Sequence, residues 1–451
     1  MGEPLVWHRL QFAFTIVFHY LFPQLTMGLA LLVCVMKGIG VFRRDEAWLR
    51  AARFWIRIFA VNFGVGVMTG IPMEFQIGMN WSRFSEYAGA VIGQTLGMES
   101  LFAFFLESSV LGMLVFGERR LSPRRHFLAS VALFVGSWLS AYFIVTTNAF
   151  MQHPVGFTTN ARGALELASF SAFMTNPWAL VEWAHVMCAT VVTASFVVSA
   201  VGAYYVLSGR AADDGRVFLK VGTTAGLVAS LLVAFPTGDL QAKLVAKHQP
   251  VALAAMEGRF TTENAAGITL IGQPNVQARR LDNPIKVPGM LSFLAYGTFH
   301  SDVRGLEDFP EKDWPTNIEL LYYAFHIMAG IGTIQIAIMG FARALLLLRR
   351  LERWPLMLWA LMLSFPLPYI ATTCGWMTAE LGRQPWLVFG LFRTSEGSST
   401  KVHSGDTLFS LIGFSGLYLL LGLVFLFLVG RVLRDGPRDL DSDGHAEKAH
   451  A

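Results

Sequence analysis

The chain has 451 residues, of which 54% are hydrophobic and only 15% are charged, and its mean hydropathy is +0.49. A soluble domain of this length exposes far more charge, so the composition excludes an ordinary soluble enzyme. The net charge of +4 comes from basic residues that flank apolar runs, and it does not indicate nucleic-acid binding.

Nine apolar runs are each long enough to cross a bilayer, for which about 20 residues are needed. They cover about 10–36, 55–80, 95–117, 127–150, 178–207, 218–236, 318–349, 355–382 and 407–433. The runs are too long and too uniformly apolar for barrel strands, so we predict an all-α membrane protein with nine transmembrane helices. The first run has neither a positive leader nor a small-residue cleavage site, so we expect no cleavable signal peptide.

Basic residues alternate between the connections and predict the orientation of the chain. The odd-numbered connections and the tail are rich in Lys and Arg, whereas the short even-numbered connections hold few. This pattern predicts a periplasmic N-terminus and a cytoplasmic C-terminus. The expected organisation is 1–236 with helices one to six, a periplasmic loop at 237–317, helices seven to nine at 318–434, and a disordered cytoplasmic tail at 435–451.

Ionisable and polar groups interrupt the first, third and fourth runs. His19 lies in the first run, Glu99 and Glu107 in the third, and Ser140 in the fourth. Ionisable side chains inside a bilayer are costly and indicate function by default. The eight residues between Glu99 and Glu107 give an offset of about 80° and a rise of about 12 Å, so both can face the same interior. With Ser140 at similar depth and trapped water, they would form a proton relay.

The fifth and seventh runs pair a histidine with a methionine. His185 lies in AHVMCATVVTASFVV and Met328 in LYYAFHIMAGIGTIQ. One neutral His and one Met on facing helices make a six-coordinate, low-spin haem site. A lone His could instead bond to the backbone or line a transporter cavity, and one of 18 methionines says little by itself. The matching depth of His19, His185 and Met328 favours the haem.

A long outer loop and the eighth run contain the remaining candidate features. The loop at 237–317 holds several prolines and a helix-like DLQAKLVAKH, and a loop of this length is usually functional. Glu380 lies at the outer end of the eighth run, one turn after Trp376, which could anchor the helix at the interface or pack on a porphyrin. The candidate ligands all lie within about 15 Å of the outer surface. Electrons could therefore enter from a substrate held by the loop.

Three functions fit these residues. The first is a haem-carrying terminal oxidase subunit. The second is a haem b subunit that binds quinone and passes electrons on without reducing O₂. The third is a secondary transporter with midplane carboxylates, which the outward clustering and the lack of an internal repeat disfavour. Cys34, Cys188 and Cys374 lie within apolar runs and are best interpreted as buried thiols.

From about 8 to 433 the chain resembles subunit I of the cytochrome bd-type quinol oxidases. The matching motifs are RLQFAFTIVFHYLFP, GMESLFAFFLESS, the fifth-run His185, LYYAFHIM and GWMTAELGRQPW. The resemblance implies a bacterial inner-membrane subunit that oxidises quinol at the outer face. It would reduce O₂ to water with cytoplasmic protons, building a proton gradient without pumping.

The resemblance also implies residue roles. His185 and Met328 match the ligands of a low-spin haem b. His19 and Glu380 match ligands of two high-spin haems, a haem b and either haem d or a third haem b, with Glu99 nearby. Glu257 in LAAME matches the glutamate of the quinol-binding loop. The proton relay matches Glu107 and Ser140, while Arg9 and Arg383 match arginines near the haem propionates.

Some positions depart from the family pattern. Ala252 stands where well-studied members have a lysine, and Lys243 or Lys247 is left as a candidate substitute. His326 replaces an arginine two residues before the ligand methionine. KHQPVALAAMEG is similar to the cyanide-insensitive branch, in which a b-type haem can stand in place of haem d. The family implies a second multi-span subunit as partner, often with a small single-span one.

Overall fold

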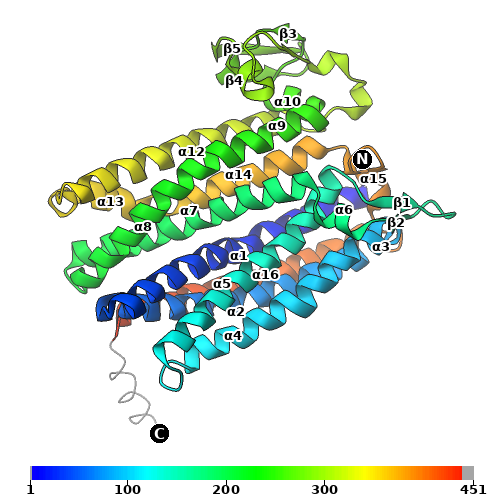
Figure 1. Cartoon of the computed structure of the whole chain (residues 1–451). Helices are drawn as coiled ribbons and strands as arrows, with labels where there is room; N and C mark the ends of the chain where they lie inside the picture. The colour runs from blue at the N-terminus through cyan, green and yellow to red at the C-terminus, as the bar shows by residue number, and fades with distance from the viewer. Residues whose placement is uncertain (1–2, 439–451) are drawn as a thin grey trace.

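The structure is a computed structural model that describes residues 3–438. Among those residues, nine helices are long and apolar enough to cross a membrane, which confirms the predicted all-α architecture. The spans are Pro4–Arg43, Glu46–Met79, Ser82–Phe116, Pro123–Gln152, Phe170–Ser208, Ala212–His248, Ile318–Leu347, Pro355–Arg383 and Ser404–Asp435. They form one bundle in which the start of the first span and the end of the last lie at opposite ends (Figure 1).

The spans are longer than the predicted apolar runs because the helices continue through polar residues at both ends. The first five spans contain α1 (Glu3–Arg43), α2 (Glu46–Met79), α3 (Ser82–Met98), α4 (Phe105–Phe116), α5 (Pro123–Gln152), α6 (Phe170–Met174) and α7 (Pro177–Ser208). The last four contain α8 (Ala212–Leu232), α9 (Asp239–His248), α12 (Ile318–Leu347), α13 (Pro355–Leu363), α14 (Pro366–Arg383) and α16 (Ser404–Asp435). The described part of the predicted tail begins with the end of α16, and 439–451 lie outside the described residues.

Two of the spans contain π-helical segments. The third contains a π-helical segment, η1 (Glu99–Phe104), between α3 and α4. The sixth contains an irregular segment, η2 (Val233–Gly238), where Phe235 has φ −146° and ψ 127° before α9 continues. Breaks of this kind in a membrane helix are tolerated where the freed backbone groups are buried in protein, and π segments occur frequently at functional sites. The first break begins at Glu99, one of the predicted site residues.

Helix caps fix the positions of α5 and α7. The Ser122 hydroxyl accepts from the Arg125 N–H at 3.4 Å at the start of α5, and Pro123 occupies the first turn. At the start of α7 the Asn176 side chain accepts from the Trp178 N–H at 3.0 Å. A side-chain acceptor followed by proline is a typical helix start. Where these two helices begin sets the depth of Ser140 and His185.

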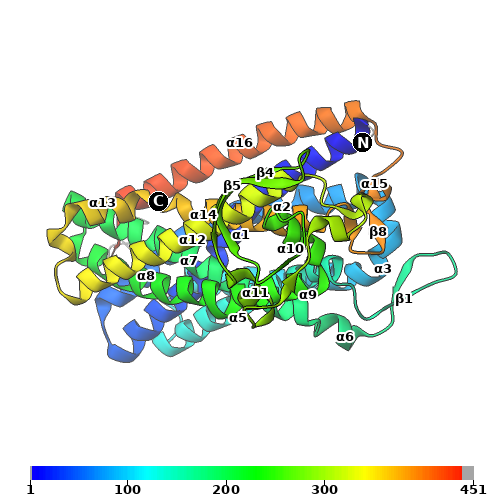
Figure 2. The same ribbon diagram turned by 90° about the horizontal axis from the view of Figure 1, so that it is seen from above.

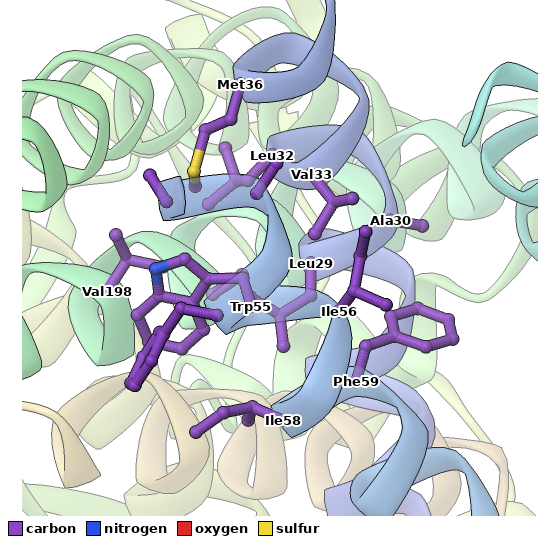
Figure 3. Packing of buried hydrophobic residues seen from close by; sticks show 14 of the residues in the cluster. Leu29, Ala30, Leu32, Val33, Met36, Trp55, Ile56, Ile58, Phe59 and Val198 are labelled. Atoms are coloured by element: carbon purple, nitrogen blue, oxygen red, sulfur yellow. The ribbon is translucent and has the colours of Figure 1, made fainter. Parts of the chain in front are cut away.

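A large apolar cluster packs α1, α2, α5, α7 and α8 together, away from the segment between α9 and α12 that is described below. Leu29, Met36, Trp55 and Phe59 belong to it and are almost fully buried, and Figure 3 shows Trp55 between α1 residues and Val198. At Gly28 a Cβ would collide with the Thr190 carbonyl, so this glycine permits the close approach of α1 to α7. The close packing of this cluster fixes α1, α2, α5 and α7 relative to one another, and these helices carry the side chains described in the next subsection.

The segment between α9 and α12 folds over one end of the bundle, here called the loop end (Figures 1 and 2). It contains α10 (Pro250–Met256), β3 (Glu263–Asn264), β4 (Ile268–Asn275), β5 (Arg280–Val287), α11 (Met290–Tyr296), β6 (Asp302–Val303) and 3₁₀ turns at Leu306–Asp308 and Glu311–Asp313. Strand β4 pairs antiparallel with β5, and β3 with β6. Smaller elements elsewhere are β1 (Phe157–Thr159), β2 (Leu165–Leu167), β7 (Trp386–Val388), β8 (Phe392–Arg393), α15 (Thr394–Gly397) and a 3₁₀ turn at Leu351–Arg353.

Candidate functional site

His185 on α7 is held in one tautomer by a threonine of the sixth span. Its Nδ1 lies 3.2 Å from Oγ1 of Thr237, in the irregular segment η2. That hydroxyl donates its own hydrogen to the Leu232 carbonyl at 2.7 Å, so it accepts from the Nδ1–H of His185. The lone pair of Nε2 is therefore left for a ligand, as in metal-binding histidines whose other nitrogen is fixed by a supporting group.

His19 on α1 is held in the same way by α2. Its Nδ1 lies 3.1 Å from Oγ1 of Thr69, which donates to the carbonyls of Val65 and Gly66. A Cβ at Gly70 would lie 2.9 Å from Cε1 of the imidazole, so the glycine leaves room for the ring. His19 thus also presents an Nε2 lone pair.

Met328 lies on α12 with its sulfur against α14. A Cβ at Gly375 would lie 3.0 Å from the Sδ atom, so the thioether sits at a notch in α14 made by that glycine. Helix α14 packs along α12 on one side and contacts α7 on the other. His185 and Met328 therefore lie on two helices that both contact α14.

Glu380 near the end of α14 has donors for both of its carboxylate oxygens. Asn148 donates to Oε1 at 2.7 Å, and Arg383 donates to Oε2. The Arg383 guanidinium is 2% exposed and also donates to the Leu387 carbonyl at 2.7 Å. Charge-assisted bonds of this kind stabilise an ionised carboxylate. The predicted contact of Arg383 with a haem propionate remains a prediction.

The acidic side chains of the third span are separated by the π-helical segment. Ser140 donates to Oε1 of Glu99 at 3.1 Å. Glu107 is 6% exposed and lies beside α5 one turn nearer its start, where a Cβ at Gly136 would be 3.4 Å from its Cγ. The structure thus pairs Ser140 directly with Glu99, and the predicted passage of protons from Glu107 to this pair stays a prediction.

Glu257 follows α10 and is buried in the segment between α9 and α12, here called the loop domain. Its Oε2 accepts from the Thr269 N–H at 3.0 Å, and burial raises the pKa of this carboxyl to about 7. The cations whose charge acts on it are Arg259 and Lys286. Lys243, one of the two candidate substitutes, pairs with Asp239 at 2.6 Å.

Ala252 shows why a lysine does not fit at its position in this chain. Its side chain is 1% exposed, and a Cβ at Gly382 would lie 3.3 Å from its Cβ. Helix α10 therefore rests closely on the end of α14, next to Arg383. The basic charge near Glu257 comes instead from Arg259 and from Lys286 of β5.

Arg9 and Trp376 are two further residues predicted to lie near a porphyrin. Arg9 is half-buried in the first turns of α1, and Trp376 is half-buried on α14 one turn before Glu380. Their roles at a haem remain predictions.

Several site residues were not identified from the sequence. Thr69 and Thr237 orient the two histidines, and Asn148 binds Glu380. Glu182 lies one turn before His185, is 6% exposed, and has no hydrogen bond to either carboxylate oxygen. An ionisable residue three positions before a candidate ligand in an apolar run was the available signal for Glu182. The threonines carried no such signal, because their partners come from other helices.

This donor set suits haem. Two imidazoles with a free Nε2, a thioether and a carboxylate are typical axial ligands or near neighbours of haem iron. Among the described residues, no group of three or more His, Cys, Asp or Glu could hold a bare metal ion. The side chains therefore fit a porphyrin that spans several helices better than a protein-only metal centre.

Comparisons with known proteins find relatives over nearly the whole chain. The family model for cytochrome bd terminal oxidase subunit I matches residues 7–437. Cytochrome bd ubiquinol oxidase subunit 1 of Bacillus subtilis is 36% identical, with 98% of this chain and 95% of that protein covered. Cytochrome bd-II ubiquinol oxidase subunit 1 of Escherichia coli is 31% identical, with 96% and 97% covered. The solved bd oxidase of Geobacillus thermodenitrificans has a TM-score of 0.88 at 30% identity, covering 96% of this chain and 99% of that one.

Proposed function

This chain belongs to the cytochrome bd terminal oxidase subunit I family, and from that premise we propose which of its residues carry each part of the reaction. It is a haem-bearing, multi-pass subunit of a quinol:O₂ oxidoreductase in a bacterial inner membrane. The Bacillus and Escherichia relatives are both ubiquinol oxidase subunits. This disfavours a transporter and an electron-transfer subunit that leaves O₂ untouched.

The residue assignment rests mainly on one observation: the imidazoles of His19 and His185 make the same supporting contact with a threonine. His19 and His185 each give the Nδ1–H to a threonine hydroxyl that is already donating, and each keeps Nε2 unprotonated. The same supporting contact occurs on two independent helices, and it is the arrangement that orients an imidazole toward a metal. We assign His185 and Met328 to a low-spin haem, and His19 and Glu380 to two high-spin haems.

Haem, when bound, supplies the one-electron and O₂ chemistry, which no side chain of this protein provides. The protein supplies orientation and charge. Thr237 and Thr69 fix the imidazoles, Gly375 makes room for the thioether, and Asn148 with Arg383 holds the Glu380 carboxylate in place. The low-spin haem is proposed to be haem b, one high-spin haem to be haem b, and the third to be haem d or haem b.

Protons are proposed to move at two places. At the loop end, which we assign to the periplasm, Glu257 takes a proton from quinol. From the cytoplasmic end, protons reach the oxygen site through Glu107 and then the bonded pair Glu99 and Ser140. Release on one side and uptake on the other would separate charge without pumping.

A spectrum of the purified oxidase tests the haem assignment. The reduced-minus-oxidised difference should contain one low-spin and two high-spin components, and extraction of the haems decides between haem d and a third haem b. His185→Ala should remove only the low-spin component, while His19→Ala should remove a high-spin one. Loss of the same component in both variants would contradict the assignment.

Replacing Glu257 with glutamine should slow quinol oxidation about tenfold, the effect of losing one charge-assisted contact with substrate. Its pKa of about 7 means that the ionised, proton-accepting form appears as pH rises through about 7. Wild-type quinol oxidation should therefore increase with pH across that range, and the variant should lose this dependence. Steady-state O₂ consumption with quinol, measured from about pH 5.5 to about pH 8.5, on either side of that pKa, checks both effects.

Glu311→Gln is the matched control for this prediction, because Glu311 is an exposed loop carboxylate that pairs with Arg279 at the surface. It should leave the rate and the pH profile unchanged. A Glu257→Gln enzyme with normal turnover and a normal profile would reject the quinol role. The haem spectra of both variants should match the wild type.

A second large subunit should co-purify with the chain. Only 11% of the most apolar window of α16 and 19% of that of the third span are buried within this chain, so much apolar surface remains for lipid and a partner. We expect a multi-span partner, with or without a small single-span chain, when tagged protein is purified in mild detergent and identified by mass spectrometry. A stable, fully haem-loaded and active lone chain would contradict this expectation.

A further inference from the structure

Two buried polar atoms without partners lie in the region where the segment between α9 and α12 packs on α12. Glu257 is 2% exposed and Tyr322 is 1% exposed. Oε1 of Glu257 and the hydroxyl of Tyr322 make no hydrogen bond, although the carboxylate is near enough to act electrostatically on the phenol. Buried polar groups are almost always paired, so two unpaired groups in one region need an explanation. A bound ligand with its own polar group would explain both of them.

Two glycines bring the loop backbone onto the Tyr322 ring. Gly258, directly after Glu257, has φ +61°, and a Cβ there would lie 3.2 Å from the ring. A Cβ at Gly272 on β4 would lie 3.0 Å from the hydroxyl oxygen. Any larger residue at Gly258 would be strained as well as crowded. The backbone at these glycines thus packs closely against both Tyr322 and Leu281 of β5.

One residue, Thr269, links the Glu257 carboxylate to α12 through its two backbone polar groups. The Thr269 N–H donates to Oε2 of Glu257 at 3.0 Å, and the Thr269 carbonyl lies 3.0 Å from Nε2 of His326. The His326 ring stacks on Tyr322 with 3.9 Å between centroids. Because Oε2 of Glu257 already accepts a hydrogen bond from Thr269, Oε1 is the oxygen that can take a proton. The contacts among Thr269, His326 and Tyr322 fix the position of this carboxylate relative to the Tyr322 phenol.

An apolar surface leads to this seam. On β4, the strand that contacts α12 beside Tyr322, two exposed apolar side chains directly precede Gly272. Leu270 and Ile271 on β4 are 54% and 61% exposed. A lipophilic substrate in the bilayer can lie along this surface with its polar head toward the loop.

We propose that Tyr322 is a quinol-binding residue whose hydroxyl, together with Oε1 of Glu257, contacts the reacting oxygen of the quinol. This inference rests on the proposed role of Glu257. In the step, the quinol O–H bond breaks and a Glu257 O–H bond forms, while one electron leaves the quinol for the haems that the family's activity supplies. The Tyr322 hydroxyl keeps its proton and donates a hydrogen bond to the oxygen as negative charge develops there.

A packing role for Tyr322 makes the opposite predictions. If only the ring mattered, a phenylalanine at this position would be neutral or stabilising, because a buried hydroxyl without a partner is itself unfavourable. Quinol kinetics would then be unchanged. A binding role instead requires that loss of the hydroxyl damages the reaction with quinol and nothing else.

The test is Tyr322→Phe in the complete oxidase with its partner, with a short-chain quinol as substrate. We expect kcat/KM for quinol to fall about tenfold, the effect of losing one hydrogen bond to a charged oxygen. The haem spectra and the reoxidation of chemically reduced enzyme by O₂ should not change. Tyr296→Phe is the control, because it removes an exposed hydroxyl from α11 in the same segment and should leave kcat/KM unaltered.

A second variant probes the contact itself. Gly272→Ala places a methyl group against the Tyr322 hydroxyl and should lower kcat/KM in the wild type but less in the Tyr322→Phe background. Equal losses in both backgrounds would overturn the proposal, as would normal kinetics in Tyr322→Phe. If Tyr322→Phe is normal while Glu257→Gln is impaired, the Tyr322 inference fails and the Glu257 role stands. If both are normal, the Glu257 role fails as well.

Discussion

Replacing Met328 with leucine should abolish quinol oxidation and convert the low-spin haem to a high-spin form or remove it. Leucine has nearly the same volume but no sulfur to donate to iron. We expect quinol-dependent O₂ consumption to fall by more than about 100-fold, the upper end of the loss seen when even a supporting group of a metal site is removed.

Met339→Leu on the same helix is the matched control. Met339 is fully buried, and its thioether packs against Gly226 in an apolar cluster. A volume-conserving change there should leave spectrum and turnover intact. An unchanged low-spin spectrum in Met328→Leu would reject Met328 as a ligand, whatever the activity of that variant.

Replacing Glu107 with glutamine should slow O₂ reduction about 100-fold, the lower end of the contribution of a positioned proton donor. Glutamine keeps the shape of the side chain beside Gly136 but cannot release a proton. Reduction of the haems by quinol should proceed at nearly the wild-type rate, because Glu257 serves that half of the reaction at the loop end. Stopped-flow oxidation of the fully reduced enzyme, with a pH indicator for proton uptake, separates the two halves.

Two further variants, one of them a control, accompany the Glu107→Gln experiment. Glu86→Gln changes an exposed carboxylate of the same span and should have no effect. Ser140→Ala removes the donor to Glu99 and should slow proton uptake without altering quinol oxidation. Normal O₂ consumption and proton uptake in Glu107→Gln would mean that protons enter by another route.

The third span follows the prediction from residue spacing in one respect and departs from it in another. Both carboxylates face α5, because Ser140 bonds to Glu99 and Gly136, one turn nearer the start of α5, lies beside Glu107. The predicted offset assumes a regular α-helix, however, and Glu99–Phe104 is π-helical. The apolar run at 95–117 gave no signal for this π segment, so only the structure reveals it.

The basic group near Glu257 is a second example. Lys243 and Lys247 lie on α9, shortly before Glu257 in the chain, and are the candidates that the sequence offers. The cations that act on the carboxylate are instead Arg259 and Lys286. Lys286 belongs to β5, which pairs with β4 and so returns toward the Thr269 backbone that binds Glu257. Strand pairing over this distance in the chain depends on backbone contacts that no local pattern encodes.

The sequence by itself determined the membrane class, the nine spans and the identity of the chemistry. Long, uniformly apolar runs in lipid form helices, and a histidine or carboxylate inside such a helix is costly enough to indicate a function. Only the tertiary structure decided the state of those groups. Thr69 and Thr237 fix the imidazole tautomers, Gly375 admits the thioether, and Gly258 and Gly272 close the loop on Tyr322. Each is a contact between helices or between loop and helix. The role of a threonine or glycine at such a contact cannot be predicted from the sequence, because it depends on which residue packs against it.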